Sequence, residues 1–103
     1  MLMVEVSMFP VDKGESLSEY VSKVLSIIDK SGLPYRVNPM GTVIEGEWDK
    51  VMEVIKKCHV ALENDCRRIY TSIKIDYRKG GGTRMEAKIE SIEQKIGKAL
   101  TKY

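Results

Sequence analysis

The feature that most restricts the fold of this chain is the alternation of mainly apolar and mainly polar side chains over residues 67–79. Successive side chains of a strand point to opposite faces, so the pattern predicts a strand with Ile73 and Ile75 on one face and Lys74 and Asp76 on the other. A strand with one apolar and one polar face is typical of an antiparallel sheet that is covered on one side only.

Three further extended segments are predicted. Residues 4–8 alternate in the same way and end at Pro10, which indicates a first strand. Residues 35–37 and 42–47 are shorter extended segments, and residues 38–41 between them have the composition of a turn.

Apolar residues at a spacing of three and four predict three helices. The first and the third begin with capping boxes, in which a hydroxyl and a glutamate three residues later satisfy the free amides of a helix start. The helices are expected from Ser16 to a stop at Gly32, from about Trp48 to Leu62, and over about 84–103 after the triple glycine 80–82; the capping boxes are Ser16 with Glu19 and Thr83 with Glu86.

The first six elements run strand, helix, strand, strand, helix, strand, which is the split βαβ plan. We therefore expect an α+β fold of the ferredoxin-like βαββαβ type: an antiparallel four-stranded sheet, two helices on one of its faces and an extra C-terminal helix. The chain of 103 residues is 43% hydrophobic and 31% charged, which suits a single globular domain spanning residues 1–103.

Charge and hydropathy argue against several classes of partner. The net charge of +2 gives no electrostatic reason to expect nucleic acid or a membrane surface. The strand at residues 42–47 carries carboxylates, where an RNA-binding module of this topology has basic and aromatic residues. No apolar run approaches the roughly 18 residues of a membrane span, and residues 1–10 lack a basic leader, so we expect a cytoplasmic protein.

Metal and catalytic sites are not expected. Cys58, His59 and Cys66 are the only cysteines and histidine of the chain, fewer than the four ligands of a structural zinc site, and the two cysteines fit buried apolar positions better than a disulfide scaffold. The adjacent side chains of Cys58 and His59 point apart on a helix, so they predict no catalytic pair. The glycines at 80–82 lack the Gly-Lys-Ser/Thr of a P-loop and are interpreted as a linker. We therefore predict no enzyme, no metal and no cofactor.

The uncovered face of the sheet is the part of the chain that needs an explanation. One interpretation is a solvated face with cross-strand Glu–Lys ion pairs; the other is a contact between the sheets of two subunits that encloses a small polar ligand. The third helix has two interpretations as well, docking on a partner subunit or packing on its own sheet. A bulge at Gly41 or Gly46 would reverse the face assignment. Without a bulge, the open face carries Glu5, Ser7, Phe9, Val43, Glu45, Glu47, Tyr70, Ser72, Lys74 and Asp76.

Two motifs resemble those of a known family. Residues 38–48, Asn-Pro-Met-Gly-Thr-Val-Ile-Glu-Gly-Glu-Trp, resemble one signature of the small thiamine-binding-protein family, and residues 68–78, with Thr-Ser-Ile-Lys-Ile-Asp, resemble a second. The Ser-Met-Phe-Pro segment at residues 7–10 fits the first strand of the family, so the resemblance covers nearly the whole chain. It implies a ferredoxin-like fold, a homotetramer built as a dimer of dimers, and binding of thiamine or its hydroxymethylpyrimidine part without known catalysis.

The resemblance and the face assignment together give a set of candidate ligand-binding residues. Carboxylates suit an aminopyrimidine or a thiazolium cation, hydroxyls suit the pyrimidine edge, and aromatic rings provide a platform. A lysine next to a cation fits less well; it could pair with Glu45 or face a tail or phosphate. The alternative is an oligomeric regulatory domain that binds another small effector. The candidates are the carboxylates Glu45 and Glu47, the hydroxyls Ser7, Thr42 and Ser72, the aromatic rings Phe9 and Tyr70, and also Asn38 and Lys74.

Overall fold

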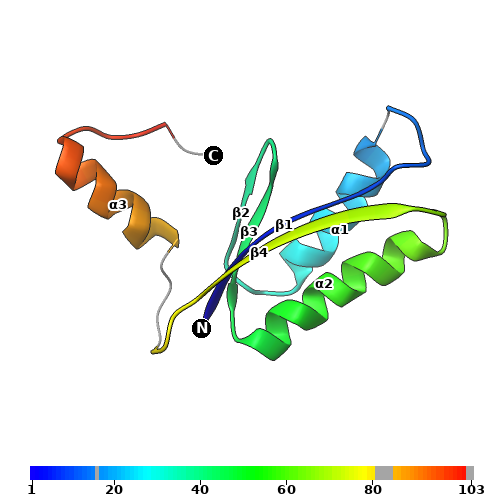
Figure 1. Ribbon diagram of the computed structural model, residues 1–103, viewed down its shortest axis with the longest axis horizontal. Helices are drawn as coiled ribbons and strands as arrows, with labels where there is room; N and C mark the ends of the chain where they lie inside the picture. Colours follow the sequence, from blue (N-terminus) through cyan, green and yellow to red (C-terminus); the bar gives the residue numbers. More distant parts are fainter. Residues whose placement is uncertain (16, 81–84, 102–103) are drawn as a thin grey trace.

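The computed structural model describes residues 1–15, 17–80 and 85–101 (Figure 1). Its elements follow the predicted order of strand, helix, two strands, helix, strand and helix. They are β1 (Leu2–Pro10), α1 (Ser18–Lys30), β2 (Tyr35–Asn38), β3 (Gly41–Gly46), α2 (Trp48–Glu63), β4 (Ile69–Tyr77) and α3 (Met85–Ile96).

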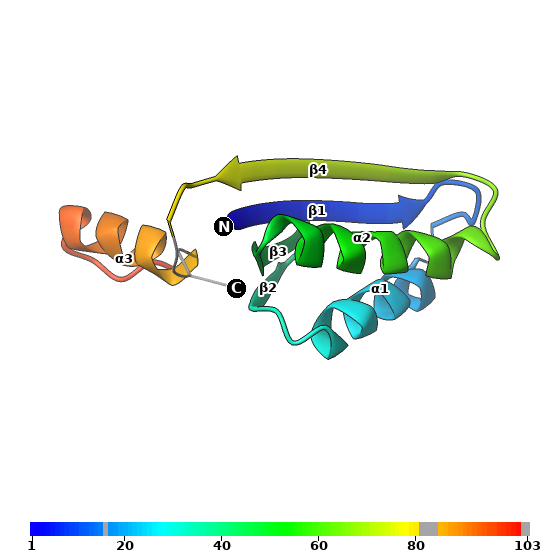
Figure 2. The same ribbon diagram turned by 90° about the horizontal axis from the view of Figure 1, so that it is seen from below.

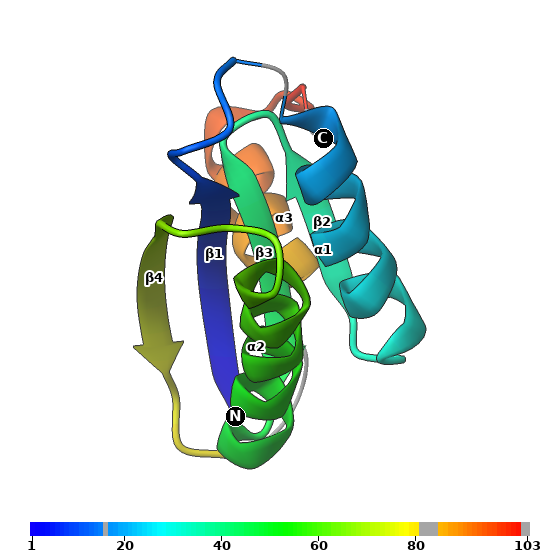
Figure 3. The ribbon, with the colours of Figure 1, turned by 90° about the vertical axis from the view of Figure 1, so that its right-hand side faces the viewer.

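The four strands form one antiparallel sheet in the order β2-β3-β1-β4. This is the strand order of two interleaved βαβ halves, so the predicted ferredoxin-like α+β fold is confirmed. The helices α1 and α2 lie side by side on one face of the sheet, as Figures 2 and 3 show.

The register of the central strands contains no bulge. Residues of β1 face β3 one to one from Leu2 opposite Gly46 to Val6 opposite Thr42, and they face β4 one to one over all of β1. The bulge considered at Gly41 or Gly46 is therefore absent. Gly41 instead lets β3 lie close to β1, because a Cβ at this residue would be 3.1 Å from the main-chain oxygen of Val6.

The core lies between the sheet and the helices α1 and α2. Alternate residues of β1 are buried in it, beginning with Leu2, and Cys58 of α2 is buried among them. Burial of this kind contributes roughly 25 cal/mol per Å² of apolar surface. The core consists of Leu2, Val4, Val6, Met8, Val24, Ile28, Ile44, Val51, Val54, Ile55, Cys58, Leu62 and Cys66.

The ends of the helices differ in part from the prediction. Both capping boxes include residues outside the described ranges, Ser16 and Thr83; the N-cap position of α1 is occupied by Leu17. The third helix was predicted to continue to residue 103, but it ends at Ile96. The cause is Gly97, whose φ of +67° is a left-handed conformation that stops a helix.

The third helix lies away from the other two, beyond the opposite face of the sheet (Figures 1 and 2). Its first turn contacts that face through Met85 and Lys88. Its later residues Ile92 and Ile96 are more than half exposed. The interpretation in which α3 packs on its own sheet thus holds for the first turn, whereas about half of the surfaces of Ile92 and Ile96 remains exposed.

Candidate functional site

A cavity of about 570 Å³ lies between the open face of the sheet and α3. The sheet contributes side chains from all four strands, and the helix and the segment after it close the other side. Five of the lining residues are charged, and most of the others are apolar. It consists of Met3, Glu5, Arg36, Asn38, Val43, Lys74, Ile75, Asp76, Met85, Lys88, Ile89, Leu100 and Thr101.

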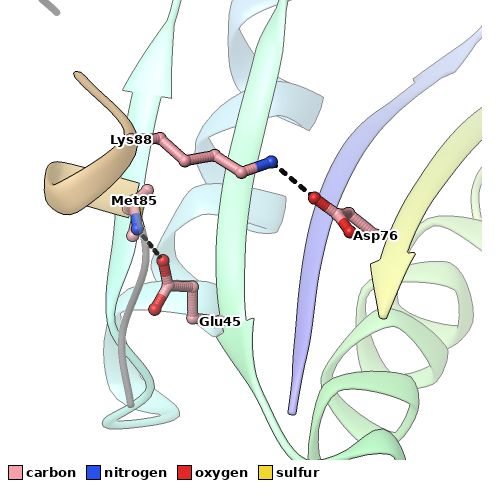
Figure 4. A network of polar contacts seen from close by, with 4 residues as sticks. All are labelled: Glu45, Asp76, Met85 and Lys88. Carbon is pink, nitrogen blue, oxygen red and sulfur yellow. Dashed lines mark hydrogen bonds and ion pairs between the residues drawn. The ribbon is translucent and has the colours of Figure 1, made fainter. Parts of the chain in front are cut away.

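The position of α3 depends on Glu45 of β3. This side chain is only 1% exposed, and its carboxylate accepts a hydrogen bond from the main-chain amide of Met85, the first residue of the helix (Figure 4). A negative charge is favourable at a helix N-terminus, where amides lack partners within the helix. Glu45 therefore anchors one wall of the cavity and is not itself part of the lining.

A second contact joins α3 to the edge of the sheet. The Nζ of Lys88 donates to Oδ2 of Asp76 on β4 at 2.5 Å (Figure 4). The two side chains are about half exposed, so we attribute to this ion pair a modest stabilisation of roughly 0–1 kcal/mol. Its main consequence is geometric, because it places one ammonium and one carboxylate at the rim of the cavity.

A cross-strand ion pair lies on the sheet side of the cavity. Glu5 of β1 stands opposite Lys74 of β4, with 3.8 Å between Oε1 and Nζ. A pairing of Lys74 with Glu45 was predicted as one possibility and is wrong, because β1 separates β3 from β4. The expectation of Glu–Lys pairs across this face is confirmed for Glu5 and Lys74.

Some of the predicted ligand-binding residues meet at this cavity and others do not. Asn38 and Lys74 line it, and Glu45 supports its wall. Glu47 is the exposed N-cap residue of α2, outside the cavity. Ser72 is exposed on β4 opposite Ser7.

A smaller cavity of about 310 Å³ collects several of the others. It lies between α1, β1 and the turn that joins β2 to β3, and its lining includes Ser7, Phe9 and Thr42, together with Asn38, which lines both cavities. Thr42 stands opposite Val6 on the helix side of the sheet, so it is buried there and does not share the open face with Glu5. The side chain of Asn38 caps the turn by accepting a hydrogen bond from the amide of Met40 at 2.9 Å.

The two predicted platform residues form a pair of their own. Phe9 and Tyr70 stand opposite each other, with ring centroids 5.8 Å apart. Four residues along the strand separate them from Glu5 and Lys74, a distance of about 13 Å at the usual rise of a strand. The aromatic pair therefore lies outside the larger cavity.

Residues of all four strands, of α3 and of the segment after α3 line the cavity but were not predicted as part of the site. Glu5, Val43 and Asp76 had been placed on the open face but not in the ligand set, and the alternation of their strands was a sufficient signal for them. The docking of α3 has no such signal in the sequence. The missed residues are Met3, Glu5, Arg36, Val43, Ile75, Asp76, Met85, Lys88, Ile89, Leu100 and Thr101.

The thiols and the histidine lie elsewhere. Cys58 is buried under α1, its Sγ 3.7 Å from the carbonyl oxygen of Val24, and burial raises the pKa of its thiol to about 11. His59 pairs with Glu63 one turn later on α2, with 3.1 Å between Nε2 and Oε2. Among the described residues, no group of three or more histidines, cysteines and carboxylates could hold a metal ion. No helix within that part of the chain is long and apolar enough to cross a membrane.

Comparison with known families adds a direct match. The sequence model of the family described as thiamine-binding protein matches residues 4–93. A UPF0045 protein of Methanocaldococcus jannaschii is 38% identical over 91 residues, which are 88% of this chain and 91% of that protein. A UPF0045 protein of Clostridium perfringens is 33% identical over 96 residues, 92% of this chain and 93% of that protein.

Two solved structures share the fold over most of both chains. A crystal structure of a hypothetical protein from Methanocaldococcus jannaschii has a TM-score of 0.82 at 38% identity and covers 90% of this chain and 96% of that one. A crystal structure from Thermotoga maritima has a TM-score of 0.77 at 28% identity, with 88% and 97% covered. The Thermotoga protein is described as a candidate thiamine biosynthesis or salvage protein.

Proposed function

Because this chain belongs to the family of thiamine-binding proteins, we propose that it binds thiamine, or the hydroxymethylpyrimidine part of thiamine, between the open face of its sheet and α3. The observation that carries the proposal is the lining of the larger cavity, where carboxylates, ammonium groups and apolar side chains surround about 570 Å³. Small-molecule sites typically have volumes of roughly 300–1,000 Å³ and combine apolar walls with a few polar groups.

The chemistry of thiamine suits these groups. Its thiazolium ring is positively charged, its aminopyrimidine ring carries hydrogen-bond donors and acceptors, and its tail ends in a hydroxyl. Glu5 and Asp76 offer carboxylates for the cation and the amino group, and Met3 and Val43 offer apolar surface for the rings. A hydrogen bond to a charged group contributes roughly 1.5–3 kcal/mol, so three of them are compatible with micromolar affinity.

In this proposal the ligand is bound without being converted. Four of the five charged lining residues are held in two ion pairs, Lys88 with Asp76 and Lys74 with Glu5. The sole histidine of the chain, His59, points to Glu63 on α2, and the thiol of Cys58 is buried in the core. Neither His59 nor Cys58 therefore belongs to the cavity lining, and the carboxylates of the lining are engaged in ion pairs.

We also propose that copies of the chain associate, as a homotetramer built from two dimers, and that a second copy covers part of the site. The support is the surface that a single chain leaves open. The side chains of Ile92 and Ile96 on α3 are more than half exposed, and the same helix forms one wall of the cavity. A contact between copies at α3 would bury this stripe and shield the ligand from water.

Isothermal titration calorimetry with thiamine, hydroxymethylpyrimidine and thiamine diphosphate tests the proposal. We expect saturable micromolar binding of thiamine by the wild type. Glu5→Gln should weaken that binding by about tenfold or more, because it removes one charged hydrogen bond. Glu53→Gln makes the same charge change on the exposed surface of α2 and should leave the affinity unchanged.

The result that contradicts the proposal is the absence of heat with all three ligands from a folded protein. Titration with amino acids belongs in the same series. If the protein binds an amino acid saturably but does not bind thiamine, the alternative is favoured, which is an oligomeric regulatory domain that binds another effector.

A further inference from the structure

The open face of the sheet carries one row of four side chains that crosses all four strands. Glu5 of β1 stands opposite Val43 of β3 on one side and opposite Lys74 of β4 on the other. Arg36 of β2 stands in turn opposite Val43. All four residues line the larger cavity. The order of groups from β2 to β4 is therefore a guanidinium, an apolar side chain, a carboxylate and an ammonium.

The charges of the cavity do not cancel. Three of the described lining residues are basic and two are acidic, so the formal charge of the lining is +1. Free thiamine has one positive charge on its thiazolium ring, which is the same sign. A phosphate ester adds roughly 1.5–2 negative charges near neutral pH, so a phosphate ester of thiamine is anionic overall. The charge of the cavity therefore favours the ester over free thiamine.

The ammonium of Lys74 has hydrogen-bond donors to offer. Its Nζ lies 3.8 Å from Oε1 of Glu5, which is longer than the roughly 3.2 Å of an N–H···O hydrogen bond. A lysine ammonium has three donors, and the side chain of Lys74 is largely exposed at the cavity. Lys74 can therefore donate to a phosphate oxygen while it remains next to Glu5.

A second ammonium lies at the same end of the row. Asp76 follows Lys74 by two residues on the same face of β4, about 6.6 Å along the strand. The Nζ of Lys88 on α3 is 2.5 Å from Oδ2 of Asp76, so this pair offsets the negative charge of Asp76 (Figure 4). The β4 end of the row thus offers ammonium groups from two elements, Lys74 from the sheet and Lys88 from the helix.

We propose that this end of the cavity is a phosphate subsite and that the preferred ligand is a phosphate ester of thiamine, an inference that rests on the proposed function. The ligand lies across the strands. Its phosphate accepts hydrogen bonds from Lys74 and Lys88, and its thiazolium ring lies beside Glu5. Its aminopyrimidine ring packs on Val43, with the ring nitrogens toward Arg36.

The order of groups along the row determines the direction of the ligand. In the ester the thiazolium ring stands between the pyrimidine and the phosphate, and only an ethyl linker separates it from the phosphate. Glu5 is one strand away from Lys74, or about 4.8 Å, but two strands away from Arg36, or about 10 Å. A thiazolium ring beside Glu5 therefore brings the phosphate within reach of Lys74 and not of Arg36.

Isothermal titration calorimetry with thiamine and thiamine monophosphate tests the subsite. We expect the wild type to bind the monophosphate about tenfold more tightly, as one additional charged hydrogen bond allows. Lys74→Met should reduce this preference to about threefold or less. Lys50→Met removes the same charge from the exposed surface of α2 and should leave the preference unchanged. Circular dichroism checks that each variant is folded.

Arg36→Met tests the direction of the ligand. It removes a cation from the β2 end of the same row, so it should weaken the binding of both ligands by the same factor and leave their ratio unchanged. A ratio that falls in Arg36→Met but not in Lys74→Met would place the phosphate at β2 and overturn the proposed direction.

The failure of the subsite is distinguishable from the failure of the proposed function. Equal affinities of the wild type for thiamine and its monophosphate would overturn the phosphate subsite and leave thiamine binding itself intact. A preference that persists unchanged in Lys74→Met would overturn the role of Lys74. The absence of binding of either ligand by the folded protein would contradict both the subsite and the proposed function.

Discussion

The buried carboxylate of Glu45 accepts a hydrogen bond from the main-chain amide of Met85, forty positions later in the chain. This contact joins β3 to the start of α3 and thereby determines where the helix stands over the open face of the sheet. Because α3 forms one wall of the larger cavity, the site depends on a residue that does not line it.

Glu45→Ala should therefore loosen α3 more than any other element. The amide of Met85 loses a charged acceptor, and we expect a loss of about 1–3 kcal/mol in the free energy of unfolding, measured by chemical denaturation. Amide hydrogen exchange should accelerate over Met85–Ile96 and stay unchanged in α1 and α2. Glu45→Gln keeps a carbonyl acceptor, so its free energy of unfolding should lie between those of Glu45→Ala and the wild type. Unchanged exchange in α3 of Glu45→Ala would contradict the anchoring role.

Lys74 should discriminate between free and phosphorylated ligands. Its ammonium repels the thiazolium ring but attracts a phosphate, and its side chain is 81% exposed at the cavity. Lys74→Met should therefore leave the affinity for thiamine equal or higher and lower the affinity for thiamine diphosphate by about tenfold or more. Calorimetry with both ligands gives the comparison, with the exposed Lys50→Met on α2 as control. Equal loss for both ligands would assign Lys74 a structural role.

Cys58 should resist thiol reagents in the native protein. Burial raises the pKa of its thiol to about 11, so at mildly alkaline pH very little thiolate is present, and access is blocked as well. Alkylation followed by mass spectrometry should proceed about two orders of magnitude more slowly at Cys58 than in the denatured chain. Rapid labelling under native conditions would mean that α1 and α2 separate readily.

Asp12 should make stability depend on pH in the acid range. The main-chain amide of Arg67 donates to its carboxylate at 2.8 Å, and this bond holds the pKa of Asp12 below its ordinary value of 3.8. A lowered pKa stabilises the folded state above pH 3.8, and the contribution is lost as the pH falls through the folded value. Thermal melts of Asp12→Ala and wild type should thus differ most near neutral pH and converge in acid. A difference that is independent of pH would contradict this role.

The order of the elements was predictable because each strand and helix carries a local pattern. The alternation in residues 69–77 and the helical stripe of Val51, Val54 and Cys58 are properties of the segments themselves, and the structure places both as predicted. The end of α3 was predicted less well, since its apolar spacing continues past Gly97, where a left-handed main chain ends the helix.

The site was less predictable, because it depends on how α3 returns to the sheet. After Gly97 the chain turns back, and the amide of Leu100 donates to the carboxylate of Glu93 at 2.5 Å, which brings Leu100 to the cavity. No periodicity in the sequence indicates such a contact. The face assignment correctly placed Glu5 and Asp76 on the open side, whereas Thr42, which was predicted as a ligand hydroxyl, lies opposite Val6 on the helix side.

Two-dimensional ¹H–¹⁵N NMR of the wild type during a thiamine titration reports both whether the ligand binds and where it binds. We expect saturable chemical-shift changes that are largest at residues of the larger cavity, such as Met3, Val43 and Met85, with the outer face of α2 unaffected. Shift changes that cluster instead around Leu17 and Met40 would place the ligand in the smaller cavity. That outcome, or the absence of any shift change at saturating thiamine, would rule out thiamine binding between the sheet and α3.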